Sequence, residues 1–492
     1  MSILIATPEL AGYTSPVDGP STVAGRLAAG LSAAWRRQRQ AVSLVMPFYR
    51  PLAERLDHLE ATELHLKVKL GHSELMVRVW RAVSAGGVPL WLLERDEFFN
   101  RELVYGPEDA PYGDNPSRFL FFSHGAIALL PHVQPAPTLL HCVDWPTGAV
   151  PAITRQLGLA LPTVFTFTTL TEQGRSHRRD FELTNLPWNY FAPHGLEFHG
   201  DLNLAKAGMA FAHAVTTVSP AYAADACTPE FGAGLDGVLR DADAGGRLRG
   251  IHPGIDTDFW DPSTIADCGK PFSTKKPGNK AACKRELQKL LGLAAKKRPP
   301  LLAWLAPLSA ASGCERLMQV MNELVGAQMQ LVVAADGEPF LRDYFRNMAE
   351  AYPKQIAFQP TANPGHLFHL LAGADFLLCP AGYPTTIEPI LEAARLGVLP
   401  VTEHQGAARD WLLPVSPGKK KVNKKEKGLI PAVALPEGSA ETLLAGLRAA
   451  IALAEADDRL AELQAQAMSI DYGWDAAAKE YQSVYKKAKK RV

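Results

Sequence analysis

The stretch "CPAGYPTTIEPILEAARLGVLPVTEHQG", residues 379–406, predicts the architecture of the chain. It begins at the end of an apolar strand, crosses a short loop, continues as a helix that ends at Gly397, and enters a second apolar strand. Such a βαβ unit belongs to a parallel sheet, and open α/β sheets bind ligands at the carboxyl ends of their strands. The loop and the start of the helix, where Glu388 and Glu392 lie one turn apart, are therefore predicted to form a ligand site.

The composition is that of an ordinary globular chain. Hydrophobic residues make up 47% and charged residues 21% of the 492 positions, and the formal net charge is zero. A chain of this length exceeds what one hydrophobic core fills, so we expect two large domains, or three. Zero net charge argues against nucleic acid or an anionic membrane as a partner.

Cysteine usage and the start of the chain bear on the compartment. The six cysteines are scattered without CxxC or paired-histidine spacing, which argues against structural zinc or a disulfide framework and suits a reducing cytoplasm. The first residues, "MSILIATPEL", lack the basic segment of a signal peptide, and no window reaches 18 consecutive apolar residues. We therefore expect a soluble cytoplasmic protein without a metal site.

Short apolar strands alternate with helical stretches along the whole chain. "SILIAT", "AVSLVMPFY" and "TVFTFTTL" are examples from the first half, and "MQLVVAA" and "DFLLCP" from the second. The alternation predicts an α/β fold of two doubly wound, mostly parallel sheets that face each other across a cleft. We expect a first domain at 1–261, a linker at 262–294, a second domain at 295–465, and a closing helix at 466–492 that packs back on the first domain. The lysine-rich segment 415–431 is predicted to be a solvated surface loop, with a patch for an anionic partner as the alternative.

Generic catalytic motifs do not identify the chemistry. The chain has no GxGxxG after a strand, no GxxxxGK[ST], no HExxH and no GxSxG. His141 ends a predicted strand, where it is either a site histidine or a satisfied structural one.

Several longer stretches resemble the glycogen and starch synthases. "YGDNPSRFLFFSHGA" (112–126), "GLEFHGDLNLAKAGMAFAHAVTTVSPAYAADACTPEFGAGLDGVL" (195–239), "GIHPGIDTDFWDP" (250–262) and "DYGWDAAAKEY" (471–481) are similar to segments of that family, in the same order. The resemblance covers nearly the whole chain. It implies the GT-B fold and transfer of glucose from ADP-glucose to the end of an α-1,4-glucan, without a further cofactor.

The same resemblance locates departures from the family pattern around the donor. The family's Lys-Thr-Gly-Gly loop reads Pro16-Val17-Asp18-Gly19 here, so its lysine is absent. Where the family carries an Arg and a Lys after the first strand of its second domain, this chain has Pro307 and Ser312. Because negative charge develops on the leaving pyrophosphate, cations at these positions would stabilise the transition state. The resemblance thus implies a weakened donor site.

Other family positions follow the same trend. The family's HDWH reads "VDWP", which retains Asp144 and replaces both histidines, and its T-x-HN reads "TFTT". In the opening stretch, Pro384 stands at the family's glutamate and Ile387 at its glycine. Glu388 followed by Pro389 supplies the missing Glu-Pro only if the alignment slips by four residues. Glu392 stands where broader GT-B enzymes carry a ribose-binding glutamate, and a helix-surface carboxylate is the equal alternative.

The resemblance and the residue types together define the candidate site. We expect Asp114 and Asp144 as catalytic residues, Glu392, Glu388 and Arg409 at the donor, and Arg118, His141, Lys206 and Gly19 lining the cleft. Two main functions remain open, and a GT-B enzyme that uses a different donor is a third possibility. The chain is either a synthase-type glucosyltransferase with weak or lost transfer, or a non-catalytic paralogue that binds α-glucan or an active synthase.

Overall fold

The computed structural model describes residues 1–14, 22–107, 110–265, 269–298, 300–360, 364–379, 387–416, 426, 428–436 and 438–492. The chain forms two compact units. Among the residues described, the first unit contains those of 1–14, 22–254 and 474–492, and the second contains those of 255–473. The chain therefore leaves the first unit after Gly254 and returns to it at Trp474.

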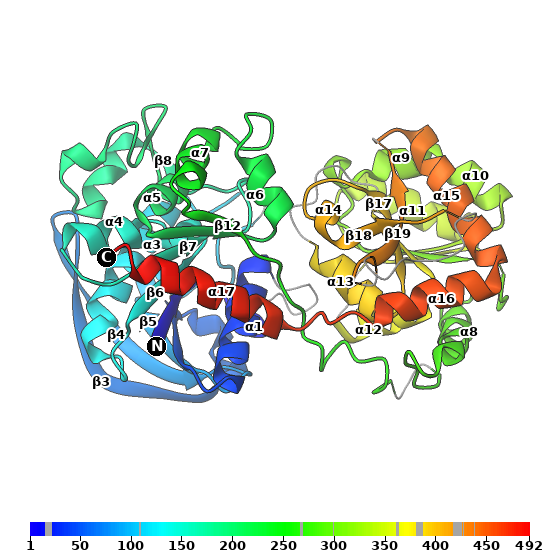
Figure 1. Cartoon of the computed structure of the whole chain (residues 1–492), viewed down its shortest axis with the longest axis horizontal. Helices are drawn as coiled ribbons and strands as arrows, with labels where there is room; N and C mark the ends of the chain where they lie inside the picture. The colour runs from blue at the N-terminus through cyan, green and yellow to red at the C-terminus, as the bar shows by residue number, and fades with distance from the viewer. Residues whose placement is uncertain are drawn as a thin grey trace. The chain divides into compact units, whose positions relative to one another are not determined.

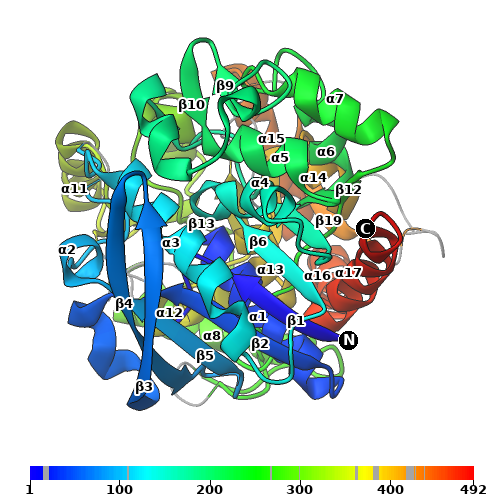
Figure 2. The same ribbon diagram turned by 90° about the vertical axis from the view of Figure 1, so that its left-hand side faces the viewer.

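The first unit is built on a nine-stranded sheet in the order β12-β11-β7-β6-β1-β2-β5-β4-β3. Pairing is parallel from β12 to β5, and β3, β4 and β5 pair in antiparallel fashion, so a hairpin closes one edge (Figure 2). The strands are β1 (Ser2–Ala6), β2 (Ala41–Pro47), β3 (Asp57–Leu70), β4 (Ser73–Val83), β5 (Pro89–Glu94), β6 (Leu139–Val143), β7 (Thr163–Thr166), β11 (Ala214–Thr217) and β12 (Leu248–Gly250). The central strands β1 and β6 are buried throughout, as continuous apolar runs in a parallel sheet require.

Helices of the first unit connect these strands. The helices are α1 (Val23–Arg37), α2 (Asp96–Phe99), α3 (Asn115–Leu129), α4 (Ala149–Gln156), α5 (Leu204–Phe211), α6 (Pro220–Ala226) and α7 (Asp236–Ala244). Helix α1 begins after Thr22, whose side chain accepts a hydrogen bond from the amide of Gly25 and so satisfies one of the free N–H groups of the first turn. It buries Leu27, Leu31 and Trp35 on one face, as its apolar spacing predicts.

A long excursion separates β7 from α5. It contains the small sheet β8 (Arg175–Ser176), β10 (Asp201–Asn203) and β9 (Glu197–Phe198), and two 3₁₀ turns, η4 (Arg178–Thr184) and η5 (Trp188–Tyr190). In Figure 2 this excursion lies beside α5 and α7.

The last helix, α17 (Trp474–Lys489), packs in the first unit beside α1 (Figure 1). Its buried face carries Trp474, Tyr481 and Tyr485. The Tyr485 ring stacks on Trp35 of α1 at a centroid distance of 5.8 Å, and its hydroxyl hydrogen-bonds His141 of β6 at 2.8 Å. The aromatic stripe that predicted a buried face therefore joins the chain end to the central sheet.

The second unit has a seven-stranded parallel sheet in the order β15-β14-β13-β16-β17-β19-β18. Its strands are β13 (Leu301–Trp304), β14 (Gln330–Ala334), β15 (Ile356–Gln359), β16 (Phe376–Cys379), β17 (Leu399–Glu403), β18 (Leu412–Pro414) and β19 (Ile430–Leu435). Its helices are α8 (Lys280–Leu290), α9 (Cys314–Gln319), α10 (Met321–Gly326), α11 (Pro339–Ala351), α12 (Pro364–Gly373), α13 (Glu388–Arg395), α14 (Ala408–Trp411), α15 (Ala440–Glu455) and α16 (Asp457–Met468). The order reverses between β13 and β16, which is the switch point where such sheets bind ligands.

The segment that was expected as a linker, residues 262–294, folds with the second unit. Its helix α8 packs on α12, and the buried ammonium of Lys280 donates hydrogen bonds to the carbonyls of Leu371, Ala372 and Leu396 at 2.9–3.2 Å. Sequence composition, rich in Pro, Lys and Gly, did not indicate this burial. Within the described part of the chain, no helix has the length and apolarity to cross a membrane.

The contact between α1 and α17 makes a specific stability prediction. A methyl group added at Gly30 of α1 would overlap the indole of Trp474. Gly30→Ala should therefore lower the free energy of unfolding by about 1–3 kcal/mol, although alanine by itself favours a helix by about 1 kcal/mol. Chemical denaturation followed by circular dichroism measures the effect.

The matched control is Gly237→Ala in α7 of the same unit, where the nearest atom to the added methyl group is a guanidinium nitrogen 4.0 Å away. This variant should be neutral or slightly stabilising. Equal stabilities for the two variants would contradict the packing of α17 on α1.

Candidate functional site

Asp144 lies at the carboxyl edge of the first sheet, directly after β6. It is a buried residue with a positive φ of 56°, a backbone conformation that costs energy for a non-glycine residue and is common at functional sites. Its carboxylate accepts two hydrogen bonds from Thr168, at 2.6 Å from the amide and 2.7 Å from the hydroxyl. Thr168 follows β7, so two adjacent strand ends fix the orientation of this carboxyl group.

Glu9 is a second buried carboxyl group at the same edge, and sequence reasoning missed it. It follows β1 and accepts hydrogen bonds of 2.7 Å from the hydroxyls of Thr22 and Tyr105. Its position, three residues after the first buried strand, was the available signal, because carboxyl ends of parallel strands gather ligand-binding residues.

Burial shifts the proton affinity of both groups. It raises the pKa of Asp144 to about 7, against the hydrogen bonds from Thr168, and the charge of Glu9 adds to this rise. Burial also raises the pKa of Glu9, against the hydrogen bonds from Thr22 and Tyr105. Asp144 can therefore hold a proton near neutral pH, and both carboxyl groups can accept hydrogen bonds from ligand hydroxyls.

The carboxylate of Asp114 is paired with Arg101. Its two carboxylate oxygens accept hydrogen bonds of 2.7 and 2.6 Å from the two terminal nitrogens of Arg101. Partial burial raises the pKa of Asp114, but the hydrogen bonds and charge of Arg101, with the charge of Arg118, outweigh it and leave the pKa lowered. Asp114 is therefore an ionised, oriented carboxylate at the start of α3.

Arg118 is completely buried in the first unit. Its guanidinium donates to the carbonyls of Phe98 and Val104, at 2.7 and 2.9 Å, and to the side chain of Asn115. Burial lowers its pKa. These contacts give it a structural role in joining α3 to the segment before it.

His141 faces α17 instead of the strand ends. Its two ring nitrogens hydrogen-bond the hydroxyls of Tyr485 and Thr166, at 2.8 and 2.6 Å. Burial lowers its pKa to about 3, so the ring is neutral. Of the two interpretations of this histidine, these contacts fit the satisfied structural one.

Lys206 lies in the first turn of α5. Its ammonium donates to the carbonyls of Pro193, at 2.7 Å, and Glu197, and burial lowers its pKa. It thereby fastens the excursion between β7 and α5 to the body of the unit.

In the second unit, Glu388 and Glu392 lie on α13, which follows β16. Glu388 is 1% exposed, and neither of its carboxylate oxygens has a hydrogen-bond partner among the described residues. Glu392 is half-buried one turn later, and Arg409 is exposed on α14 after β17. All three thus belong to elements that begin at the carboxyl edge of the second sheet.

Pro307 and Ser312, where the resemblance implies missing cations, both belong to the described part of the second unit. Pro307 is exposed in the loop after β13. The hydroxyl of Ser312 turns back into that loop, where it donates to the carbonyl of Ser309 at 2.8 Å and accepts from its amide at 3.3 Å. Ser312 therefore caps its own turn and offers no positive charge to a ligand.

A nearby arginine is already paired. Glu403 ends β17 and is buried, and one of its oxygens accepts a hydrogen bond from Arg316 of α9. Its other oxygen accepts from the Gln405 amide at 3.3 Å. Part of the positive charge at this edge is thus neutralised by the protein itself.

Several predicted site positions lie outside the described residues, namely Pro16, Val17, Asp18, Gly19 and Pro384 with the rest of the loop before Ile387, as does most of the lysine-rich loop. A search of the described residues finds no group of three or more His, Cys, Asp or Glu side chains arranged to hold a metal ion.

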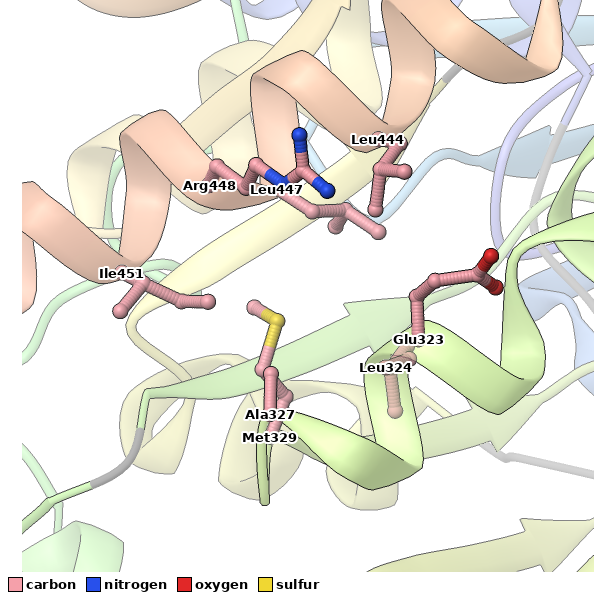
Figure 3. Close-up of a pocket in the computed structure, with 8 residues that line it drawn as sticks. All are labelled: Glu323, Leu324, Ala327, Met329, Leu444, Leu447, Arg448 and Ile451. Atoms are coloured by element: carbon pink, nitrogen blue, oxygen red, sulfur yellow. The ribbon is translucent and has the colours of Figure 1, made fainter.

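A cavity of about 230 Å³ in the second unit lies away from these residues (Figure 3). It is formed between α10 and α15, and Met329, at its base, immediately precedes β14. The cavity is therefore at the amino edge of the sheet, opposite to the predicted ligand edge. Its lining residues are Glu323, Leu324, Ala327, Met329, Leu444, Leu447, Arg448 and Ile451.

Comparison with known proteins gives a consistent result. Residues 2–241 match the family model described as the starch synthase catalytic domain. The chain is 31% identical over 493 residues to a glycogen synthase of Anaeromyxobacter sp. (strain Fw109-5), and 33% identical over 497 residues to one of Myxococcus xanthus (strain DK1622). Each alignment covers 99% of both chains.

A solved structure supports the fold. The catalytic domain of starch synthase IV from Arabidopsis thaliana, bound to ADP and acarbose, superimposes with a TM-score of 0.87 at 23% identity, with 99% of each chain covered. The predicted fold class, GT-B with two Rossmann-like domains of parallel strands, is confirmed.

The raised pKa of Asp144 predicts a pH dependence of stability. The folded protein, with a pKa of about 7, keeps a proton that an unfolded aspartate loses near pH 4, so the free energy of unfolding should fall as the pH rises from about 4 to 7. Asp144→Asn removes this group and keeps an oxygen for Thr168. It should reduce the change in the free energy of unfolding between about pH 4 and 7 by at most ~4 kcal/mol. Denaturation at a series of pH values measures this change.

Glu74→Gln, which changes an exposed carboxylate of β4 in the same unit, is the control and should leave the slope unchanged. If Asp144→Asn retains the slope of the unmodified protein, the assigned proton does not reside on Asp144.

Proposed function

The chain belongs to the glycogen and starch synthase family of glycosyltransferases, and on that premise we propose that it binds α-glucan while transferring glucose from a nucleotide sugar slowly or not at all. The nucleotide sugar of the proposal is ADP-glucose, and the acceptor is the end of an α-1,4-glucan. The proposal separates two properties that an active synthase combines, namely recognition of glucan and activation of the donor.

The charge at the carboxyl edge of the second sheet carries the proposal. Departure of a nucleoside diphosphate needs cations that face the developing negative charge. Pro307 and Ser312 are neutral, and Arg316 is paired with Glu403. The acidic residues Glu388 and Glu392 stand on α13 at this edge, and Arg409 on α14 is an exposed cation there. The proposal therefore rests on the neutral residues at positions 307 and 312.

The first unit supplies the argument for glucan. Glu9, Asp144 and Asp114 are oriented carboxyl groups, and the rings of Tyr105 and Trp145 lie beside one another at a centroid distance of 5.9 Å. Carboxylates accept hydrogen bonds from sugar hydroxyls, and aromatic faces pack on the C–H groups of a sugar ring. The solved relative is bound to acarbose, which supports a carbohydrate ligand for this chain.

A fully non-catalytic role is the second candidate. The same electrostatics favours it, because the loss of several cooperating groups abolishes activity rather than reducing it in proportion. In that case the chain would act through glucan binding or through contact with an active synthase. Measured turnover distinguishes this candidate from a slow enzyme.

Donor affinity is the first test. Each missing charge-assisted hydrogen bond is worth roughly 1.5–3 kcal/mol, so the loss of two should weaken binding by about 10²–10⁴-fold. We expect ADP-glucose to bind with a millimolar or weaker Kd in titration calorimetry. Micromolar binding would overturn the proposal of a weakened donor site.

Transfer and glucan binding form the second test. The purified protein should be retarded in glycogen-containing gels, yet incorporate little labelled glucose from ADP-glucose or UDP-glucose. Restoring single residues should not recover transfer, whereas Pro16→Lys, Pro307→Arg, Ser312→Lys and Pro384→Glu together should raise it measurably above the unmodified protein. An active glycogen synthase, assayed in parallel, serves as the reference for full turnover. Robust turnover by the unmodified chain would mean that other residues stabilise the pyrophosphate, and the proposal would then be dropped.

A further inference from the structure

An exposed aromatic cluster stands on the excursion between β7 and α5. Trp188 is 51% exposed, and it belongs to a group of aromatic side chains rather than standing singly. Its ring lies 4.7 Å from that of Phe181 and 5.7 Å from that of Phe191, measured between centroids. The guanidinium carbon of Arg178 lies 5.4 Å from the Trp188 ring and 5.5 Å from the Phe191 ring. We call Arg178, Trp188 and Phe191, supported from beneath by the buried Phe181, the Trp188 platform.

The backbone that carries the platform is fixed on both sides. Asn185 adopts a left-handed conformation with φ of 54°, and its side-chain amide donates to the carbonyl of Lys69 at 2.6 Å. The ring of His124 contacts the Leu183 carbonyl at 3.1 Å. After the platform, Lys206 holds the carbonyls of Pro193 and Glu197. A ligand would therefore meet a surface whose conformation is already set, which lowers the entropic cost of binding.

A polar cavity has part of its wall in the same excursion, shortly after the platform in sequence. It has a volume of about 410 Å³ and lies between α5 and α7, and Pro193 and His194, which follow Phe191 closely, form part of its wall. Charged side chains line much of the rest, namely Lys206, Arg240, Asp241 and Arg247. An aromatic surface next to a cavity rich in hydrogen-bonding groups fits a long, polyhydroxylated ligand better than an apolar one.

We propose that the Trp188 platform is a glucan-binding surface made of residues distinct from Glu9, Asp114 and Asp144. The exposed indole face would pack on the C–H face of a glucose unit, and the edge of the Arg178 guanidinium would donate hydrogen bonds to its hydroxyls. This inference rests on the proposed function, because it takes the glucan from there.

A protein partner is the competing occupant, since Trp and Arg also dominate protein interfaces. The centre of a protein interface is depleted of charge, whereas the cavity next to the platform is lined by lysine, arginine and aspartate. The observations therefore favour carbohydrate over protein.

Variants of the full chain test the platform by affinity electrophoresis in glycogen and by retention on amylose. Trp188→Ala should raise the apparent Kd for glycogen about tenfold or more, and Arg178→Gln about threefold. Trp188→Phe, which keeps an aromatic face, should recover most of the affinity. Phe340→Ala, which removes a 67% exposed aromatic side chain from α11 of the second unit, is the matched control and should bind as the unmodified protein does.

A second measurement covers the case in which Trp188→Ala fails to fold. Maltoheptaose should protect tryptophans of the unmodified protein from acrylamide quenching. Trp188→Phe, which should fold, should lose the part of this protection that belongs to Trp188, whereas protection of Trp145 in the proposed glucan site should remain.

The outcomes separate the two proposals. Glycogen binding that is unchanged in Trp188→Ala and Arg178→Gln would overturn the platform and leave the proposed function standing. If those variants instead lose self-association or association with an active synthase, the platform is a protein interface and the inference is wrong. Absence of glycogen binding by the unmodified protein would contradict the proposed function itself.

Discussion

The hydrogen bond between His141 and Tyr485 joins residues 344 positions apart and closes the first unit. His141 belongs to the central strand β6, and Tyr485 to the last helix of the chain. The same histidine bonds Thr166 of β7, whose hydroxyl lies 2.5 Å from that of Thr216 on β11. A neutral imidazole can serve as donor on one nitrogen and acceptor on the other, and its low pKa keeps it in that form. This buried network therefore ties together strands β6 and β7, which Asp144 and Thr168 follow.

Burial sets the chemistry of the carboxyl groups above that network. From the described residues Glu9 and Asp144 receive hydroxyl and amide hydrogen bonds but none from an arginine or lysine, so desolvation prevails and their pKa values rise. Asp114 shows the opposite outcome, because Arg101 binds both of its oxygens and keeps it ionised. The first unit thus has carboxyl groups of different proton affinity. An ionised carboxylate only accepts hydrogen bonds and a protonated one also donates, so together they can bind hydroxyl groups, which do both.

The second unit has a seven-stranded parallel sheet, and the residues at its ligand edge are those on which the proposal of a weakened donor site rests. Where a diphosphate would need cations, Ser312 caps its own turn and Arg316 is bound by Glu403. The excursion between β7 and α5 in the first unit holds the Trp188 platform on a fixed backbone. Together these features support our proposal that the chain binds glucan while activating the donor weakly.

The sequence by itself determined the fold class and the family. Alternating apolar strands and helices are local patterns of period 2 and 3.6, and the family segments stand in order along the chain, so neither needed coordinates. That Pro307 and Ser312 are neutral was also evident, because the charge of a side chain is a property of residue type. Only the tertiary structure decided which side chains meet. It placed His141 under α17, paired Asp114 with Arg101, buried Glu9 beside Thr22 and Tyr105, and left Trp188 exposed. The physical reason is that burial and pairing depend on contacts between residues distant in sequence. These contacts set the desolvation that raises the carboxyl pKa values, and they decide whether an aromatic ring is covered. Neither effect follows a period that can be read along the chain.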